Sequence, residues 1–277
     1  MAAEAEQALQ RVFVVIDPTR LVQPALEKAE WVAERNKALL HLYCCIWQPD
    51  VDRESEMVRH NIDRVEAWMQ RIATTTRAKG IEVLVEVDWD PDWRERIGHV
   101  ARASAADLIV KTVNRHSPFR RQLMRTSDWA LLRNASCPTL LVDPERPNHP
   151  KTVLAAVKLK PGDETHTVLN ERVVRLAHRI SGALEAELHA VTVYRGDEIY
   201  FDRQRFADSC QLPRNRVHAA EGSARRGIAD SVKETNADVL IIGCAASSAP
   251  ERGIIIGDTA QRIIDEVDTD IIVVPAG

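Results

Sequence analysis

The 277-residue chain lacks the features that mark membrane, secreted and nucleic-acid-binding proteins. No apolar run is long enough to cross a bilayer, and the first ten residues, MAAEAEQALQ, do not have the layout of a signal peptide. A formal net charge of −4 gives no sign of affinity for nucleic acid. We therefore expect a cytoplasmic globular protein with no membrane partner and no nucleic-acid partner.

Cysteine and metal-ligand motifs are also scarce. The five cysteines include no CxxC pair, and the nine histidines include no HExxH or similar zinc-ligand spacing. Cys44 and Cys45 lie inside an apolar run, which favours buried thiols. Cys244 follows a strand-like run, and the sequence fixes no base beside it. We predict no metal site and no catalytic residue.

What the chain does contain is an alternation of strands and helices that runs through it twice. Apolar runs without polar alternation are typical of parallel strands that are buried on both faces. We expect such strands at residues 11–17, 39–46, 81–87, 107–111, 138–142, 152–158, 187–194, 216–220, 239–242 and 271–274. The pattern predicts an α/β protein with two tandem doubly wound domains, each a roughly five-stranded parallel sheet with helices on both faces.

A proline-rich segment separates the two halves. Residues 143–150, DPERPNHP, contain three prolines, which is typical of a linker. We expect a first domain at residues 1–143, a linker at 144–150 and a second domain at 151–277.

The two halves also align with each other as an internal repeat. Residues 127–142 match residues 259–274 without a gap, and apolar positions coincide, for example Leu131 with Ile263. In a doubly wound sheet a ligand binds outside the carboxyl ends of the strands. We therefore expect any ligand at that edge of the sheet.

The most informative stretch runs from residue 237 to residue 275. A predicted strand ends at Gly243, a loop rich in small residues leads to Gly257, and Asp258-Thr259 opens an amphipathic helical pattern. Glycines allow the backbone to approach a ligand, and the free N–H groups of a helix N-terminus hold phosphate oxygens. The simpler alternative is that Gly257 relieves a turn and that Asp258 and Thr259 are ordinary helix caps.

These features together resemble the tandem form of the universal stress protein family. The resemblance rests on the two-domain repeat, on VVIDP at residues 14–18 and on TSDWALLR at residues 126–133, and it covers nearly the whole chain. It implies an adenine nucleotide alpha hydrolase-like fold and a role in the stress response. The family's nucleotide loop reads Gly, two residues, Gly, nine residues, Gly, then Ser or Thr.

This sequence departs from that loop in both halves. In the second half Gly243 and Gly257 fit the outer glycines, but Ala246 stands at the middle one, the second gap is one residue longer, and Asp258 precedes Thr259. In the first half, non-glycine residues stand at all three glycine positions: Thr112, Arg115 and Arg125.

The family also has an acidic residue after the first strand, near the adenine and ribose. The first half keeps it as Asp17, whereas Lys158 stands there in the second half. Asp17 also has a simpler interpretation as the cap of the turn that follows it. The resemblance implies ATP or another adenine nucleotide in the second domain, with Val157 and Thr192 flanking the base.

Three functions remain open from the sequence. The first is a stress-response protein that binds an adenine nucleotide at Val157, Thr192, Gly243, Gly257, Asp258 and Thr259. The second is a regulatory or interaction protein with both sites degenerate, which Ala246, Asp258 and Lys158 favour. The third is a slow ATPase, for which the sequence offers no positioned base or nucleophile, so the sequence leaves enzymatic activity undecided.

The resemblance further implies that the two halves pair with each other. The family's dimers pack through their last strands, so we expect an intramolecular pseudo-dimer. This leaves open a homodimer and a protein partner of unknown identity.

Overall fold

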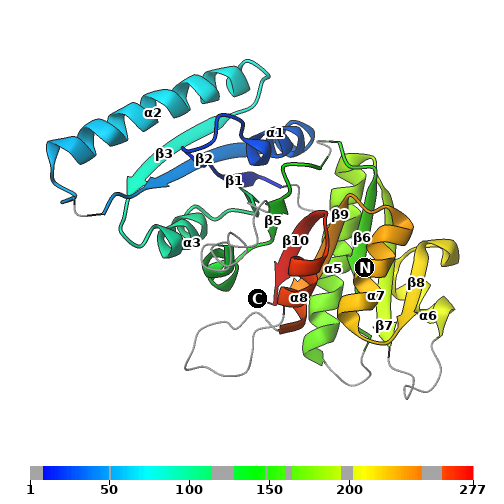
Figure 1. Ribbon diagram of the computed structural model, residues 1–277. Helices are drawn as coiled ribbons and strands as arrows, with labels where there is room; N and C mark the ends of the chain where they lie inside the picture. Colours follow the sequence, from blue (N-terminus) through cyan, green and yellow to red (C-terminus); the bar gives the residue numbers. More distant parts are fainter. Residues whose placement is uncertain are drawn as a thin grey trace. The chain divides into compact units, whose positions relative to one another are not determined.

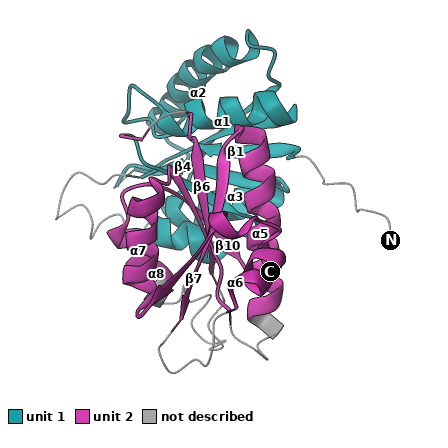
Figure 2. Cartoon of the chain, turned by 90° about the vertical axis from the view of Figure 1, so that its right-hand side faces the viewer, with its two compact units in different colours: residues 1–144 teal, residues 145–277 magenta. Residues whose placement is uncertain are grey.

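The computed structural model describes residues 9–49, 51–113, 128–146, 149–159, 164–194, 202–244 and 258–276. The chain divides into two compact units, residues 1–144 and residues 145–277, which are coloured teal and magenta in Figure 2. Each unit is an α/β structure with five parallel strands.

Unit 1 has five parallel strands in the order β3-β2-β1-β4-β5. Helices α1 and α2 lie on one face of this sheet and α3 lies on the other (Figure 1). A further helical stretch covers residues 128–134. The elements are β1 (Arg11–Val15), α1 (Pro24–Asn36), β2 (Leu39–Ile46), α2 (Glu56–Arg77), β3 (Val83–Trp89), α3 (Trp93–Ala103), β4 (Leu108–Thr112) and β5 (Thr139–Val142).

Unit 2 repeats this arrangement, with strand order β10-β9-β6-β7-β8. Helices α5 and α6 lie on one face of its sheet, and α7 and α8 lie on the other (Figure 2). The elements are β6 (Thr152–Ala156), α5 (Glu164–Leu184), β7 (Glu187–Tyr194), α6 (Arg203–Cys210), the 3₁₀ turn η1 (Arg214–Arg216), β8 (Val217–Glu221), α7 (Ala224–Thr235), β9 (Val239–Cys244), α8 (Asp258–Glu266) and β10 (Asp270–Pro275).

The central strands explain the uninterrupted apolar runs in the sequence. Helices cover both faces, so Val12, Phe13 and Val14 in β1 are all completely buried, and neighbouring side chains have no solvent face to alternate with. The predicted fold class, two doubly wound domains with five-stranded parallel sheets, is confirmed. Some strand ends differ from the prediction: β1 ends at Val15 rather than at residue 17, and β3 covers Val83–Trp89 rather than residues 81–87. Helix α2 begins at Glu56, because the Ser55 side chain accepts a hydrogen bond from Val58 N and caps the helix there.

An aspartate fixes the same junction in each unit. In unit 1, Asp107 Oδ2 accepts hydrogen bonds from the backbone N–H groups of Gln10 and Arg11, at 2.8 and 2.9 Å. In unit 2, Asp238 Oδ2 accepts from Lys151 and Thr152, at 2.7 and 3.2 Å. Each carboxylate stands just before the fourth strand of its sheet and secures the start of the first strand. The internal repeat thus extends from sequence to hydrogen bonding.

None of the helices among the described residues has the length and apolar character needed to span a bilayer.

Candidate functional site

Three of the predicted nucleotide residues form one row across the sheet of unit 2. Ala156 is in register with Val191 of β7 and with Ile242 of β9. The next residue on each strand therefore stands at the same level, and these residues are Val157, Thr192 and Gly243. The row lies at the carboxyl ends of the strands, where the fold predicts a ligand.

This row is covered by the protein itself. Val157 and Thr192 are 5% and 2% exposed, and Val157 N donates a hydrogen bond to Val191 O. A Cβ atom at Gly243 would lie 2.7 Å from Cγ of Leu169, a buried residue of α5. Gly243 is therefore explained by the close approach of α5 to β9, without a phosphate contact.

The remaining predicted residues belong to the loop and to the start of α8. Gly257 lies outside the described residues, as does Ala246. Asp258 and Thr259 are the first two residues of α8. Their contact with phosphate stays a prediction.

Lys158 follows the row and is held by two side chains of α5. Its backbone N–H donates to Asn170 Oδ1 at 3.2 Å, and Asn170 Nδ2 donates to Lys158 O at 2.7 Å. The Lys158 ammonium lies 3.1 Å from His166 Nε2. Basic groups therefore occupy the place where the family has a carboxylate.

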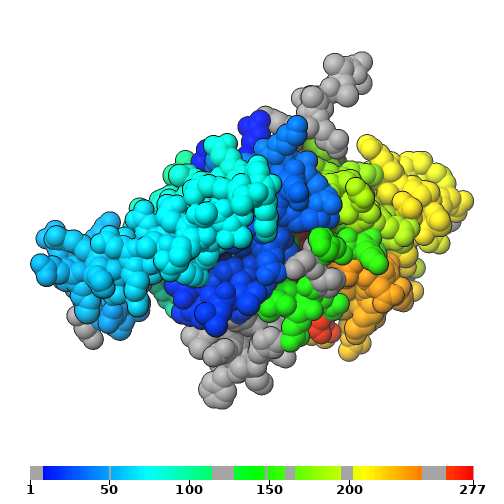
Figure 3. All heavy atoms as spheres, turned by 90° about the horizontal axis from the view of Figure 1, so that it is seen from above, coloured from blue at the N-terminus to red at the C-terminus, as the bar shows by residue number. Residues whose placement is uncertain are grey.

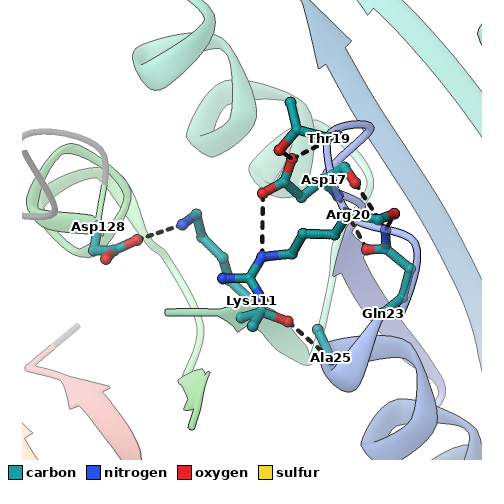
Figure 4. A network of polar contacts seen from close by, with 8 residues as sticks. Asp17, Thr19, Arg20, Gln23, Ala25, Lys111 and Asp128 are labelled. Carbon is teal, nitrogen blue, oxygen red and sulfur yellow. Dashed lines mark hydrogen bonds and ion pairs between the residues drawn. The ribbon is translucent and has the colours of Figure 1, made fainter. Parts of the chain in front are cut away.

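In unit 1, Asp17 is used by its own turn (Figure 4). Its Oδ1 accepts from the N–H and the hydroxyl of Thr19, at 2.9 and 2.6 Å, and its Oδ2 lies 3.4 Å from Arg20 Nε. Gln23 Nε2 donates to the backbone oxygen of Asp17 at 2.7 Å. The carboxylate therefore closes the β1–α1 turn, as the simpler interpretation of Asp17 proposed.

Two further polar contacts lie near the carboxyl ends of the strands of unit 1 (Figure 4). Lys111, on β4, forms an ion pair with Asp128, and the two side chains are only 14% and 8% exposed. Thr112, at the first glycine position, accepts a hydrogen bond from Ala25 N at 3.0 Å through its hydroxyl. That bond satisfies one of the free N–H groups at the start of α1.

Sequence reasoning missed Lys111, Asp128 and Leu169. Lys111 carries a signal that could have been used, because it interrupts the otherwise apolar run of β4 and a lysine is seldom buried without a partner. Leu169 carries no such signal, since it is one of many apolar residues in an amphipathic helix. Arg115 and Arg125 lie outside the described residues.

The described side chains offer little reactive chemistry. Burial raises the pKa of Cys44 and of Cys137 to about 12, and that of Cys210 to about 11. These thiols stay protonated near neutral pH and are poor nucleophiles. Within the described parts of the chain, no three His, Cys, Asp or Glu side chains are grouped so that they could hold a metal ion.

Comparison with known proteins agrees with this architecture. The Universal stress protein family matches residues 8–143 and 202–275. Universal stress protein E of Photorhabdus laumondii is 24% identical over 96% of this chain and 94% of its own length, and that of Escherichia coli is 24% identical over 96% and 93%. A functionally unknown protein from Pseudomonas aeruginosa has a crystal structure with a TM-score of 0.80 and 26% identity, covering 99% of this chain and 95% of that one. The chain belongs to the universal stress protein family, with two tandem domains of that family over nearly its full length.

Proposed function

We propose that this chain acts in the stress response as a regulatory protein that works through a protein partner rather than through a bound nucleotide. The role in the stress response follows from the family and from relatives named universal stress protein E. Two contacts at the strand ends support the regulatory part of the proposal. In unit 1 Lys111 pairs with Asp128, and in unit 2 Leu169 packs against Gly243.

The charges at the two crevices support the same proposal. A ribose hydroxyl needs an acceptor, but Asp17 already accepts from Thr19 and faces Arg20, and Lys158 replaces it in unit 2. The Asp17 carboxylate would have to give up its hydrogen bonds to Thr19 before it could bind a ribose hydroxyl. Loss of these hydrogen bonds weakens the binding of a nucleotide by the free energy that the bonds contribute.

Equilibrium dialysis of the full chain against labelled ATP tests this function. We expect no saturable binding at millimolar ATP, and no difference between the wild-type chain and Gly257→Asp. Saturable binding that Gly257→Asp abolishes would contradict the proposal.

A second candidate function is binding of an adenine nucleotide in unit 2. It is favoured by the common level of Val157, Thr192 and Gly243 at the carboxyl edge of three adjacent strands. In this candidate Val157 and Thr192 flank the base, and the backbone near Gly243 and Gly257 holds phosphate. A universal stress protein has been solved in complex with cAMP.

The start of α8 supplies the other contacts of this candidate. The hydroxyl of Thr259 would donate to phosphate, and Asp258 would stand at the helix N-terminus. The dialysis experiment separates the two candidates, because saturable ATP binding lost on Gly257→Asp belongs only to the second.

Pairing of the two halves as an intramolecular pseudo-dimer, and a homodimer of the whole chain, stay predictions. Light scattering on the full chain distinguishes the mass of one chain from that of two.

A further inference from the structure

Two histidines meet at the edge of the sheet in unit 2. His189 lies on β7 and His218 lies on β8, and β8 pairs only with β7 among the strands that the structure describes. His189 Nδ1 is 2.9 Å from His218 Nε2, and the rings are stacked with centroids 5.2 Å apart and planes at 27°. A contact of this length between ring nitrogens is a hydrogen bond, so one nitrogen donates and the other accepts.

The proton count decides whether this bond can exist. Two neutral rings form it, and one charged ring beside one neutral ring forms it as well. Two charged rings cannot, because both nitrogens then carry a proton and the two positive charges repel. The bond therefore survives the uptake of a first proton and is lost on the uptake of a second.

Charged groups surround the pair from each neighbouring element. On β7, Glu187 Oε1 lies 3.5 Å from His189 Nε2, and it also lies 3.0 Å from Arg216 Nε at the end of η1. Arg203 of α6 and Glu234 of α7 interact electrostatically with His218. Burial is the main cause that lowers the pKa of both rings, and the neighbouring arginines lower it further, whereas the glutamates oppose the change.

The same position in unit 1 carries different chemistry. Leu40 and Leu188 stand opposite equivalent residues of β1 and β6, so His41 of β2 corresponds to His189. The register of the next strand makes Glu86 the counterpart of His218. His41 Nε2 lies 2.9 Å from Glu86 Oε2, a contact that protonation of the histidine strengthens.

We propose that the His189–His218 pair is an acid-sensitive latch on the edge strand β8. When both rings are protonated, the ring–ring hydrogen bond is replaced by repulsion across the β7–β8 pair. Strand β8 then separates more readily from β7, and α6 follows because Arg203 Nη2 donates to Val217 O at 2.6 Å. Acidification therefore exposes an edge of the sheet, and a partner protein can recognise such an edge.

The position of the latch in unit 2 suits this role. The segment that carries α6 and β8, yellow in Figure 3, lies at the surface of the molecule. A groove between β8 and α7 reaches His218 and is lined by residues that include Arg203, Arg226 and Glu234. Solvent protons therefore have access to the pair without unfolding of the core.

Amide hydrogen exchange of the full chain tests the latch, with protection expressed relative to the intrinsic rate at each pH. Each proton that only the open form binds raises the equilibrium constant for opening tenfold per pH unit below the ordinary histidine pKa. We therefore expect protection of residues 217–221 to fall at least about tenfold between about pH 7 and about pH 5.

Two matched variants identify the cause. His218→Glu places a carboxylate beside His189, so acid no longer brings two positive rings together, and the part of the acid-induced loss of protection that comes from ring–ring repulsion is expected to disappear. His218→Gln removes the second titrating ring and is expected to do the same. Loss of protection that persists in both variants, or no loss in the wild-type chain, overturns the proposal.

Histidine ring NMR of the wild-type chain gives a result that does not depend on any variant folding. Coupled rings titrate in two separated steps that both resonances report. Two independent single-step titrations of His189 and His218 would overturn the latch.

Discussion

The two units of this protein share a frame and differ in the contacts that the ends of their strands make with the first helix. In unit 1 the row at the strand ends is Ile16, Cys44 and Thr112, and Thr112 caps α1 through its hydroxyl. In unit 2 the equivalent row has a glycine in place of Thr112, and Leu169 of α5 fills the space above it. At this position unit 1 has a hydrogen bond between the fourth strand and the first helix, whereas unit 2 has apolar packing between the equivalent elements.

This difference shows that a glycine at a family position has more than one physical explanation. Gly243 matches the first glycine of the nucleotide loop, yet its lack of a side chain is already required by Leu169. A retained motif residue is therefore evidence of ancestry, and its present role depends on what lies against it.

The buried ion pair of unit 1 gives the largest expected effect. Asp128→Ala leaves Lys111 buried without its carboxylate, which costs about 3–5 kcal/mol when one partner of such a pair is removed. Denaturant unfolding monitored in unit 1 measures this loss. The double variant Lys111→Met with Asp128→Leu is the control and is expected to be close to wild type; a loss below about 1 kcal/mol in Asp128→Ala would contradict the closed crevice.

Packing between Gly243 and Leu169 gives the next largest effect. Gly243→Ala places a methyl group against Leu169 and is expected to cost about 1–3 kcal/mol of unfolding free energy. Adding Leu169→Ala is expected to relieve that clash, so a double-mutant cycle gives a favourable coupling energy. Gly182 lies on α5, as Leu169 does, and has open space around it. Gly182→Ala therefore serves as the control, with no loss of unfolding free energy expected. A coupling energy of zero would show that Leu169 is not the reason why position 243 excludes a side chain.

Thr112 gives a smaller effect in unit 1. Thr112→Val keeps the shape of the side chain but leaves the buried N–H of Ala25 without its acceptor, at a cost of about 1–2 kcal/mol. Thr112→Ser retains the hydroxyl and is expected to lose less. Equal losses in the two variants, measured by the same unfolding experiment, would assign the effect to packing rather than to the hydrogen bond.

The smallest expected effect is the change in unfolding free energy of unit 1 with pH that arises from His41. Burial lowers the pKa of His41 from its ordinary value of 6.5, and Glu86 only partly offsets this. The unfolded chain then binds more protons, so His41 contributes stability above about pH 6.5 that is lost as the pH falls through the folded-state pKa. His41→Gln is expected to flatten the pH dependence of unfolding free energy in unit 1. An unchanged slope would mean that His41 does not titrate differently on folding.

The fold could be predicted because its signal is local and repeated. Uninterrupted apolar runs identified the buried parallel strands, and the aligned halves identified the duplication. These features depend on residues close together in the sequence.

The state of the site could not be predicted, because it depends on contacts between elements. Asp128 reaches Lys111 across 17 positions, and His189 reaches His218 across 29, and both contacts need a known register and side-chain direction. Leu169 looks like any core residue of an amphipathic helix until β9 is placed beneath it. Asp17 was the exception, since its turn residues stand beside it in the sequence.

Mass spectrometry of small molecules released from the freshly purified, denatured chain tests most directly whether both crevices are closed. We expect no adenine nucleotide in stoichiometric amount. Release of about one nucleotide per chain would contradict the account, because a filled crevice cannot hold it.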